Sequence, residues 1–344
     1  MTVIKPVNVL GLLSTSSLEG VYVALLNTDG VDVFDYGRLQ HIPYDEALRE
    51  KIRPLLGTCP YTPEAVAEFQ AVNRELTVFH AEIVKDYIAA NGVEVDVIGY
   101  EGINLTNYAS GGETGLLGDG KLLAELTGIR VVCNFHAADI RAGGQGAPLD
   151  PVYYNALCAD IGKPLAVVNI SGITRVTWIG SYGEMTAFDT GPGNAAIDEW
   201  VRKHGGMHMD YNGKLAITGK VNEQIVATMM RHKYFAKYPP KSTNRSEFVE
   251  KLEHLEGLSL EDGAATATAF VAESIAYSLL LYLPEIPKIL IVCGGGAQNP
   301  TILRFLRQRL PDMAIHTAAE EGFNTNALPA QAVAYLCLLY TSDA

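Results

Sequence analysis

The sequence predicts an α/β protein made of two similar halves. Three apolar segments at 7–13, 21–26 and 31–36 are joined by short polar turns, and the same order of strand, turn, strand, turn and strand begins again at residue 165. Helical segments follow each set of three, so each half is expected to pack helices against its own sheet. The repeat lies in the order of elements and not in residue identity.

In the first half, residues 27–30 read Asn-Thr-Asp-Gly, which is typical of a hairpin turn. Thr62 and Pro63 supply an N-cap and a proline at the first helical position of a long helix. The remaining elements expected are helices at 45–56, 62–91 and 121–127, and buried strands at 95–99 and 130–135. We expect this N-terminal lobe to contain residues 1–128 together with 325–344.

The second half is expected to form a C-terminal lobe of residues 129–324. Asn299 and Pro300 form a good start signal for its last helix. Tyr277, Leu280 and Leu281 share one helical face and are expected in the core. The elements expected are strands at 165–168, 175–179, 185–188 and 289–293, and helices at 195–204, 264–282 and 301–310.

Composition excludes several classes of protein. The hydrophobic fraction of 48%, the charged fraction of 19% and the net charge of −13 describe a folded acidic globule. Lys and Arg are not clustered, so no nucleic-acid partner is expected. The five cysteines are scattered without a CxxC pair, as for buried thiols in a reducing compartment. No uninterrupted apolar segment of 18 residues occurs, so we expect no membrane span and a cytoplasmic location.

Four turns of small polar residues follow apolar strands, at residues 14–17, 169–172, 189–194 and 294–296. Small residues expose the backbone, and the N-terminus of a helix favours anions. One such turn is more often a tight connection than a phosphate site. Four together predict a nucleotide-binding cleft between the two halves.

The chain resembles the anhydro-N-acetylmuramic acid kinases, which belong to the actin, hexokinase and heat-shock-chaperone superfamily. The strings GGQGAPL at 143–149 and FDTGPGN at 188–194 carry most of this resemblance. The other matching segments, in family order, are 117–120, 138–139, 169–173, 187–198, 239–243 and 294–300.

The resemblance implies two actin/hexokinase-like (ribonuclease H-like) lobes with mixed sheets around a nucleotide cleft. It also implies an ATP-dependent kinase that acts on 1,6-anhydro-N-acetylmuramic acid from cell-wall turnover. Such an enzyme opens the anhydro bridge with water while it phosphorylates the freed 6-oxygen, which calls for a carboxylate base and Mg²⁺. A small-molecule anhydrosugar and a second copy of the chain are the expected partners.

Asp139 matches the catalytic aspartate of the family and is the expected base. Glu19 is the expected metal ligand. The sugar is expected to contact Glu101, Asn134, His136 and Gln145. The nucleotide is expected to contact Ser14, Thr15, Ser16, Ser17, Asn169, Ser171, Gly172, Asp189, Gly191, Gly193, Asn194, Gly294, Gly295, Gly296 and Asn299.

The chain departs from the family where the chemistry is expected. The family has glycine and threonine ahead of the loop serine and a metal-binding aspartate after it, where this chain has residues 15–17 and the longer Glu19. Thr15 is β-branched and disfavours positive φ. Pro329 stands where the family has a second metal-linked glutamate and cannot coordinate a cation. Residues 338–344 also differ from a family ending.

The departures near the sugar leave alternatives open. Residues 100–104 read Tyr-Glu-Gly-Ile-Asn in place of Ser-His-Gly-Gln-Thr, and residues 134–136 read Asn-Phe-His in place of Asp-Phe-Arg. The chain is therefore expected to be the kinase, a kinase for another 1,6-anhydrosugar, or an impaired paralogue that binds sugar or nucleotide. Asp139 has two readings as well, a catalytic base or a cap of the turn that follows it.

Overall fold

The computed structural model describes residues 5–15, 17–58, 62–105, 115–144 and 146–339. The predictions for Ser16, Gln145 and residues 340–344 lie outside these ranges. The chain forms two compact units: unit 1 is Met1–Leu157 with Asn326–Ala344, and unit 2 is Cys158–Thr325.

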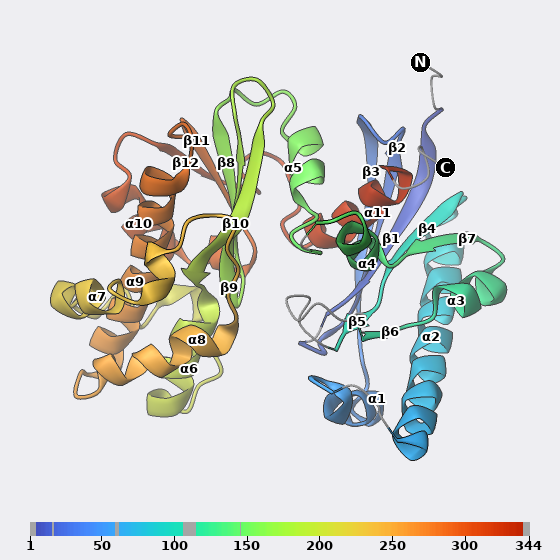
Figure 1. Cartoon of the computed structure of the whole chain (residues 1–344), viewed down its shortest axis with the longest axis horizontal. Coiled ribbons are helices and arrows are strands. Elements are labelled where there is room, and N and C mark those ends of the chain that lie inside the picture. The colour runs from blue at the N-terminus through green and yellow to red at the C-terminus, as the bar shows by residue number, and fades with distance from the viewer. Residues whose placement is uncertain (1–4, 16, 59–61, 106–114, 145, 340–344) are drawn as a thin grey trace. The chain divides into compact units, whose positions relative to one another are not determined.

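Unit 1 is built on a five-stranded mixed sheet (Figure 1). In order across the sheet, its strands are β3 (Val33–Pro43), β2 (Gly20–Thr28), β1 (Val7–Ser14), β4 (Val97–Glu101) and β7 (Arg130–Cys133). The first three strands pair antiparallel as the predicted meander, whereas β4 and β7 continue the sheet in parallel. Residues 129–157 therefore lie with unit 1 and not with the C-terminal lobe where we expected them, because β7 pairs with β4.

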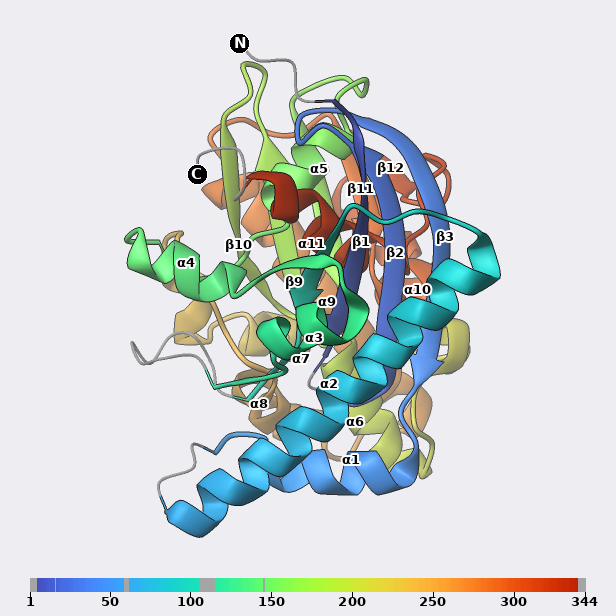
Figure 2. The same ribbon diagram turned by 90° about the vertical axis from the view of Figure 1, so that its right-hand side faces the viewer.

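Helices cover both faces of this sheet. Figure 1 shows α11 (Leu328–Leu339) on one side, and α2 (Pro63–Asn91) and α3 (Gly120–Thr127) on the other. In Figure 2, which faces the α2 side, this helix runs diagonally across the strands. The Thr62 side chain accepts a hydrogen bond from Ala65 N, as the predicted N-cap requires. The smaller elements are α1 (Glu46–Ile52), η1 (Arg53–Leu55), β5 (Ile103–Asn104), β6 (Leu116–Leu117), α4 (Phe135–Arg141) and α5 (Pro151–Leu157).

Helix α11 lies very close to the sheet because two strand residues are glycines. A Cβ at Gly11 of β1 would stand 1.8 Å from the carbonyl oxygen of Ala330, and one at Gly99 of β4 would stand 2.5 Å from that of Val333. The opposite face of the same strands carries Leu10 and other apolar side chains that pack with α2 in one buried cluster. Alternate residues of β1 thus face α11 on one side of the sheet and α2 on the other.

Unit 2 repeats the topology of unit 1. Its strands, in order across the sheet, are β10 (Met185–Pro192), β9 (Ile173–Ile179), β8 (Leu165–Ile170), β11 (Ile289–Cys293) and β12 (Ala314–Thr317). Again the first three strands are antiparallel and the last two are parallel. The same spatial order in both units confirms the predicted repeat and the expected α/β class with mixed sheets.

The core of unit 2 lies between its sheet and three helices, α6 (Asn194–Gly205), α9 (Leu260–Tyr282) and α10 (Pro300–Arg309). Asn299 caps α10 through hydrogen bonds from Thr301 N and Ile302 N, as predicted. The smaller elements are η3 (Tyr211–Gly213), α7 (Glu223–Met229), η4 (Lys233–Ala236), α8 (Arg245–Val249), η5 (Glu250–Leu255) and η6 (Gly295–Gln298).

Helix α9 is long and apolar enough to cross a bilayer by length and composition, but 78% of its apolar window is buried inside the protein. Such burial is typical of a core helix. The expectation that Leu280 and Leu281 belong to the core is wrong, since each is 52% exposed. Leu279 before them is buried and Tyr282 after them packs against the core, so Leu280 and Leu281 lie on the outer side of this last turn of α9.

The expected strand at 130–135 is shorter than predicted. It ends at Cys133, Asn134 takes a left-handed conformation with φ of 64°, and Phe135 begins helix α4. Asparagine tolerates this conformation better than most residues do. Asp139 therefore lies on a helix that the sequence did not predict, and it still precedes the glycine-rich loop.

Candidate active site

The β1–β2 turn of unit 1 holds the first set of predicted nucleotide residues. Thr15 and Ser17 share a hydrogen bond of 2.7 Å between their hydroxyls, and Leu18 N donates to Thr15 O over 3.1 Å. Among the described residues of this turn, Leu18 adopts a positive φ of 57° and Thr15 does not, so the strain of a β-branched residue at positive φ does not arise at Thr15. Ser17 and Glu19 are exposed and line a pocket with Arg49.

Ser14 has a different environment, because its side chain is buried at the end of β1. Its Oγ lies 3.0 Å from Nε2 of His80, which is fully buried in α2, and Tyr44 donates to the same Oγ over 2.6 Å. Nδ1 of His80 lies 2.8 Å from the hydroxyl of Tyr100. Burial lowers the pKa of His80 to about 3, so the imidazole is neutral near pH 7. Ser14 therefore anchors the turn to the core of unit 1.

Replacement of His80 by leucine is expected to destabilise the protein by about 2–4 kcal/mol, because the hydroxyls of Ser14 and Tyr100 lose a buried partner. Urea unfolding followed by circular dichroism measures the change. The His41→Leu variant is the control, since that side chain is exposed and its replacement should cost less than about 0.5 kcal/mol. Equal stability of both variants would show that the buried hydrogen bonds contribute nothing.

Asp139, the predicted base, lies in the last turn of α4. Its Oδ2 accepts a hydrogen bond of 2.7 Å from the backbone N–H of Gly146. Among the described residues, Oδ1 has no hydrogen-bond partner. A Cβ at Gly144 would stand 2.1 Å from Oδ2, so the glycine-rich loop folds closely around this carboxylate. Oδ2 caps the loop, whereas Oδ1 makes no hydrogen bond among the described residues. A capping role and a role as base are therefore compatible for Asp139.

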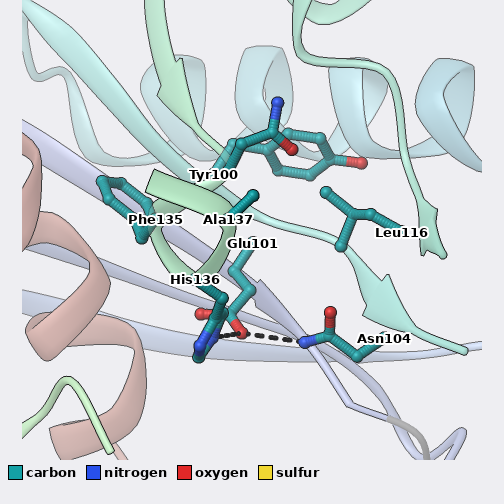
Figure 3. Close-up of a pocket in the computed structure, with 8 residues that line it drawn as sticks. Tyr100, Glu101, Asn104, Leu116, Phe135, His136 and Ala137 are labelled. Atoms are coloured by element: carbon teal, nitrogen blue, oxygen red, sulfur yellow. Dashed lines mark hydrogen bonds and ion pairs between the residues drawn. The ribbon is translucent and has the colours of Figure 1, made fainter. Parts of the chain in front are cut away.

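Three of the predicted sugar residues line one pocket beside α4, shown in Figure 3. Nε2 of His136 lies 2.6 Å from Oε1 of Glu101, at the end of β4, and Asn104 Nδ2 donates to the same oxygen over 3.1 Å. Asn134, the residue with φ of 64°, completes this group. The structure therefore brings together Glu101, Asn134 and His136, which the sequence placed about 35 residues apart.

In unit 2, the three predicted turns meet at one end of the sheet. Asn194 N donates to Ser171 O over 2.7 Å, which joins the β10–α6 turn to the β8–β9 turn. A Cβ at Gly294 would stand 2.4 Å from Oδ1 of Asn169, which joins the turn after β11 to the same place. A Cβ at Gly193 would stand 2.4 Å from Ser171 O. Gly191 lies two residues before Gly193, on β10, where the pairing of β10 with β9 changes register.

The N-terminus of α6 is not an open anion site, contrary to our reading of the turn at 189–194. Asn194 N donates to Ser171 O, and Ala195 N donates to Gly172 O over 3.3 Å. These donors are the unsatisfied groups that would otherwise attract an anion. Here both N–H groups are already hydrogen-bonded to carbonyl oxygens of the turn after β8.

The glycines at 294–296 are required by the protein itself. Gly294 has φ of 74° and Gly296 would place a Cβ 2.4 Å from the Ile170 side chain. Only Gly295 is exposed, and its Cβ would meet nothing closer than Asn194 Nδ2 at 3.2 Å. Gly295 is thus the position here where a bound molecule could approach the backbone.

Asp189 is almost fully buried, and both of its carboxylate oxygens are engaged inside unit 2. Oδ1 accepts from Arg175 Nε over 3.0 Å, and Oδ2 accepts from Thr243 N over 3.0 Å. Asp189 N in turn donates to Lys241 O. Asp189 therefore fastens the 239–243 segment to β10, and this arrangement does not fit a direct metal ligand.

Arg245 and Asp198 were not predicted from the sequence, and they flank the same turns. A Cβ at Gly172 would stand 2.8 Å from Arg245 Nε, so this guanidinium lies directly over the turn after β8. Asp198 lies on α6, and burial raises its pKa to about 6, although Arg245 acts in the opposite direction. Arg245 stands two residues after Thr243, the last residue of a segment that matches the family, and this position was the available signal. No local sequence pattern indicates that its side chain contacts Gly172.

The raised pKa of Asp198 makes stability depend on pH. Its pKa is about 6 in the folded protein against an ordinary value of 3.8, so the stability it contributes is present below pH 3.8 and is lost as pH rises to about 6. We expect Asp198→Asn to raise the free energy of unfolding at pH 7.5 by roughly 1–2 kcal/mol and to change little at pH 4. Thermal unfolding at both pH values tests this, with the exposed Asp160→Asn as control. A benefit at pH 4 as large as at pH 7.5 would contradict it.

The described residues offer few ligands for a cation. Among the described residues, no group of three or more His, Cys, Asp or Glu side chains could hold a metal ion. Mg²⁺ is commonly held by one or two carboxylates, water and substrate phosphates. Glu19 is exposed and fits that mode, with the Tyr22 hydroxyl 3.2 Å from its Oε2. Pro329, at the second position of α11, offers no ligand.

A nucleotide is better supported, because a buried polar atom has no partner at the turns of unit 2. Oδ1 of Asn169 is buried without a hydrogen bond among the described residues. It lies beside Gly294, Ser171 is exposed nearby, and Arg245 supplies positive charge at Gly172. These groups fit a ligand that carries hydrogen-bond donors and negative charge.

Comparison with known proteins agrees with the sequence motifs. The model of the family described as anhydro-N-acetylmuramic acid kinase matches residues 7–343. The protein of that name from Paramagnetospirillum magneticum is 42% identical over 333 residues, covering 96% of this chain and 91% of that protein. The one from Rhodospirillum rubrum is 43% identical over 329 residues, covering 95% of this chain and 86% of that protein.

Among solved structures, the activator of the 2-hydroxyisocaproyl-CoA dehydratase from Clostridium difficile with bound ADPNP is similar with a TM-score of 0.46. It is 12% identical and covers 98% of this chain and 96% of that chain. The family model and the two relatives together span nearly the whole chain. The chain belongs to the anhydro-N-acetylmuramic acid kinase family.

Proposed function

We propose that this protein is an ATP-dependent kinase that opens the anhydro bridge of 1,6-anhydro-N-acetylmuramic acid and phosphorylates the 6-oxygen. The observation that carries the proposal is the family match over residues 7–343, together with identities of 42% and 43% to relatives that bear this name. The position of Asp139, four residues before the family's GGQGAPL segment at 143–149, supports the same function.

Asp139 is the proposed base. Its Oδ1 takes a proton from water, whose oxygen bonds to the anomeric carbon while the bond from that carbon to the bridging 6-oxygen breaks. The freed 6-oxygen then receives the phosphoryl group, which ATP supplies when bound. The hydrogen bond from Gly146 N to Oδ2 orients the carboxylate for this step. The hydrogen bond to Oδ2 thus fixes the direction in which Oδ1 faces the water.

ATP is proposed to contact the turns of unit 2 through Asn169, Ser171 and Gly295, with Arg245 beside its phosphates. The exposed Ser17 of the β1–β2 turn is proposed as a contact from unit 1. Mg²⁺ is proposed to be held by Glu19 together with phosphate oxygens and water. The resemblance to the family further supports a homodimer and a cytoplasmic location as proposals.

Release of ADP from Mg-ATP in the presence of 1,6-anhydro-N-acetylmuramic acid tests this function. We expect sugar-dependent release that saturates with both substrates, and no release without the sugar. Folded protein that binds ATP and releases no ADP with this sugar would contradict the proposal.

A further inference from the structure

Gly146 is held at both of its backbone polar groups. Its N–H donates to Oδ2 of Asp139 over 2.7 Å, and its carbonyl oxygen is hydrogen-bonded by Nδ1 of His136. Asp139 and His136 lie one turn apart on α4. Gly146 itself is buried and has φ of 79°. The loop that carries it is thus clamped against the helix that carries the carboxylate.

His136 is in turn held by Glu101. Its Nε2 lies 2.6 Å from Oε1 of Glu101, and both side chains are 16% exposed. Asn104 Nδ2 donates to the same oxygen, as Figure 3 shows. The contact crosses from α4 to the end of β4, so it ties the helix to the central sheet of unit 1.

The hydrogen-bond partners assign the protons. A carbonyl oxygen only accepts, so Nδ1 of His136 carries a hydrogen toward Gly146. Oε1 of Glu101 accepts from Asn104 and lies 2.6 Å from Nε2, so one hydrogen is shared between Glu101 and His136 at this contact.

We propose that Glu101 and His136 form a positioning pair for Asp139, and are not the sugar contacts that the sequence pattern suggested. The chain of contacts runs from Glu101 to His136, from His136 to Gly146 and from Gly146 to Asp139. Both ring nitrogens of His136 and Oε1 of Glu101 are engaged in it. The pair sets the direction of the Asp139 carboxylate, and this inference rests on the proposed role of Asp139 as base.

Two substitutions of His136 separate its two contacts. The amide nitrogen of asparagine takes the place of Nδ1 and keeps a donor toward Gly146, whereas that of glutamine takes the place of Nε2 and keeps a donor toward Glu101. Hydrogen-bonded partners that orient metal-binding side chains contribute about 10- to 100-fold in activity, and we take the same range here. We expect kcat to fall about 10-fold in His136→Asn and about 100-fold in His136→Gln, with the KM for the sugar within about two-fold of the native protein.

Glu101→Gln keeps the size of the side chain, removes its charge and is expected to lower kcat about 10-fold. The control is Glu75→Gln, which removes an exposed ion pair with Lys51 in the same unit and should leave kcat unchanged. A raised sugar KM with kcat retained in the His136 and Glu101 variants would overturn the proposal and identify them as sugar contacts. Unchanged kinetics in all of them would overturn it too.

An additional readout does not need turnover. Hydrogen exchange of the Gly146 amide, followed by NMR, is expected to be at least 10-fold faster in His136→Gln and unchanged in Glu75→Gln, with the same melting temperature in both. Native exchange in His136→Gln would refute the clamp even in an enzyme that works as proposed. Faster exchange in a protein without kinase turnover would uphold the clamp and reject the function.

Discussion

The Asp139→Asn variant is expected to lose at least 1,000-fold in sugar-dependent ADP release. Asparagine keeps an oxygen that can accept from Gly146 N, so the loop should stay folded while the base is lost. General-base catalysis contributes about 10²- to 10⁴-fold, and no other carboxylate is hydrogen-bonded to Gly146 among the described residues. Steady-state kinetics with saturating ATP and sugar measure the loss.

The matched control for Asp139→Asn is Asp86→Asn, an exposed aspartate on α2 of the same unit. It should keep native kcat and KM. ATP affinity should be within about two-fold of native in both variants, because the nucleotide is proposed to bind elsewhere. Retention of more than about a tenth of the native kcat in Asp139→Asn would rule out Asp139 as the base.

The Gly11→Ala substitution is expected to have the largest effect on stability. The added Cβ would lie 1.8 Å from the carbonyl oxygen of Ala330, which belongs to the backbone of α11 and cannot rotate away. The helix and β1 must separate, and overpacking of this kind costs about 3 kcal/mol or more. We expect the variant to unfold at much lower urea concentration than the native protein or to be recovered only as aggregate.

Gly162→Ala provides the comparison for this prediction. Gly162 has no atom within 4 Å of an added Cβ and no positive φ, so alanine should fit at that position. The free energy of unfolding measured in urea should change by less than about 1 kcal/mol. A Gly11→Ala protein as stable as Gly162→Ala would show that α11 does not pack on β1 as closely as described.

The sequence predicted the fold well because its signals are local or repeated. Apolar strands separated by polar turns specified β1, β2 and β3 and their repeat in unit 2, and side-chain caps at Thr62 and Asn299 marked the starts of two helices. The start of α4 was missed because one residue, Asn134, turns the chain into a helix where apolar residues continue the strand pattern. The unit boundary was misplaced because only the pairing of β7 with β4 assigns residues 130–133 to unit 1.

The candidate site was predicted by position more than by role. The family resemblance identified Asp139, and the pattern of strands and small-residue turns identified the turns, of which those of unit 2 meet at one end of its sheet. The partners within each group depend on contacts between distant residues. No local sequence pattern predicts that Asn194 N donates to Ser171 O or that Arg175 donates to Asp189. The contact between Glu101 and His136 is equally non-local.

Analysis of the product formed in isotopically labelled water tests the proposed function most directly. The protein is incubated with Mg-ATP and 1,6-anhydro-N-acetylmuramic acid in water carrying heavy oxygen, and the product is examined by mass spectrometry and phosphorus NMR. We predict one labelled oxygen at the anomeric carbon, an unlabelled phosphate on the 6-oxygen, and one ADP for each sugar opened. Label in the phosphate, or ADP formed while the anhydro bridge stays closed, would contradict this account.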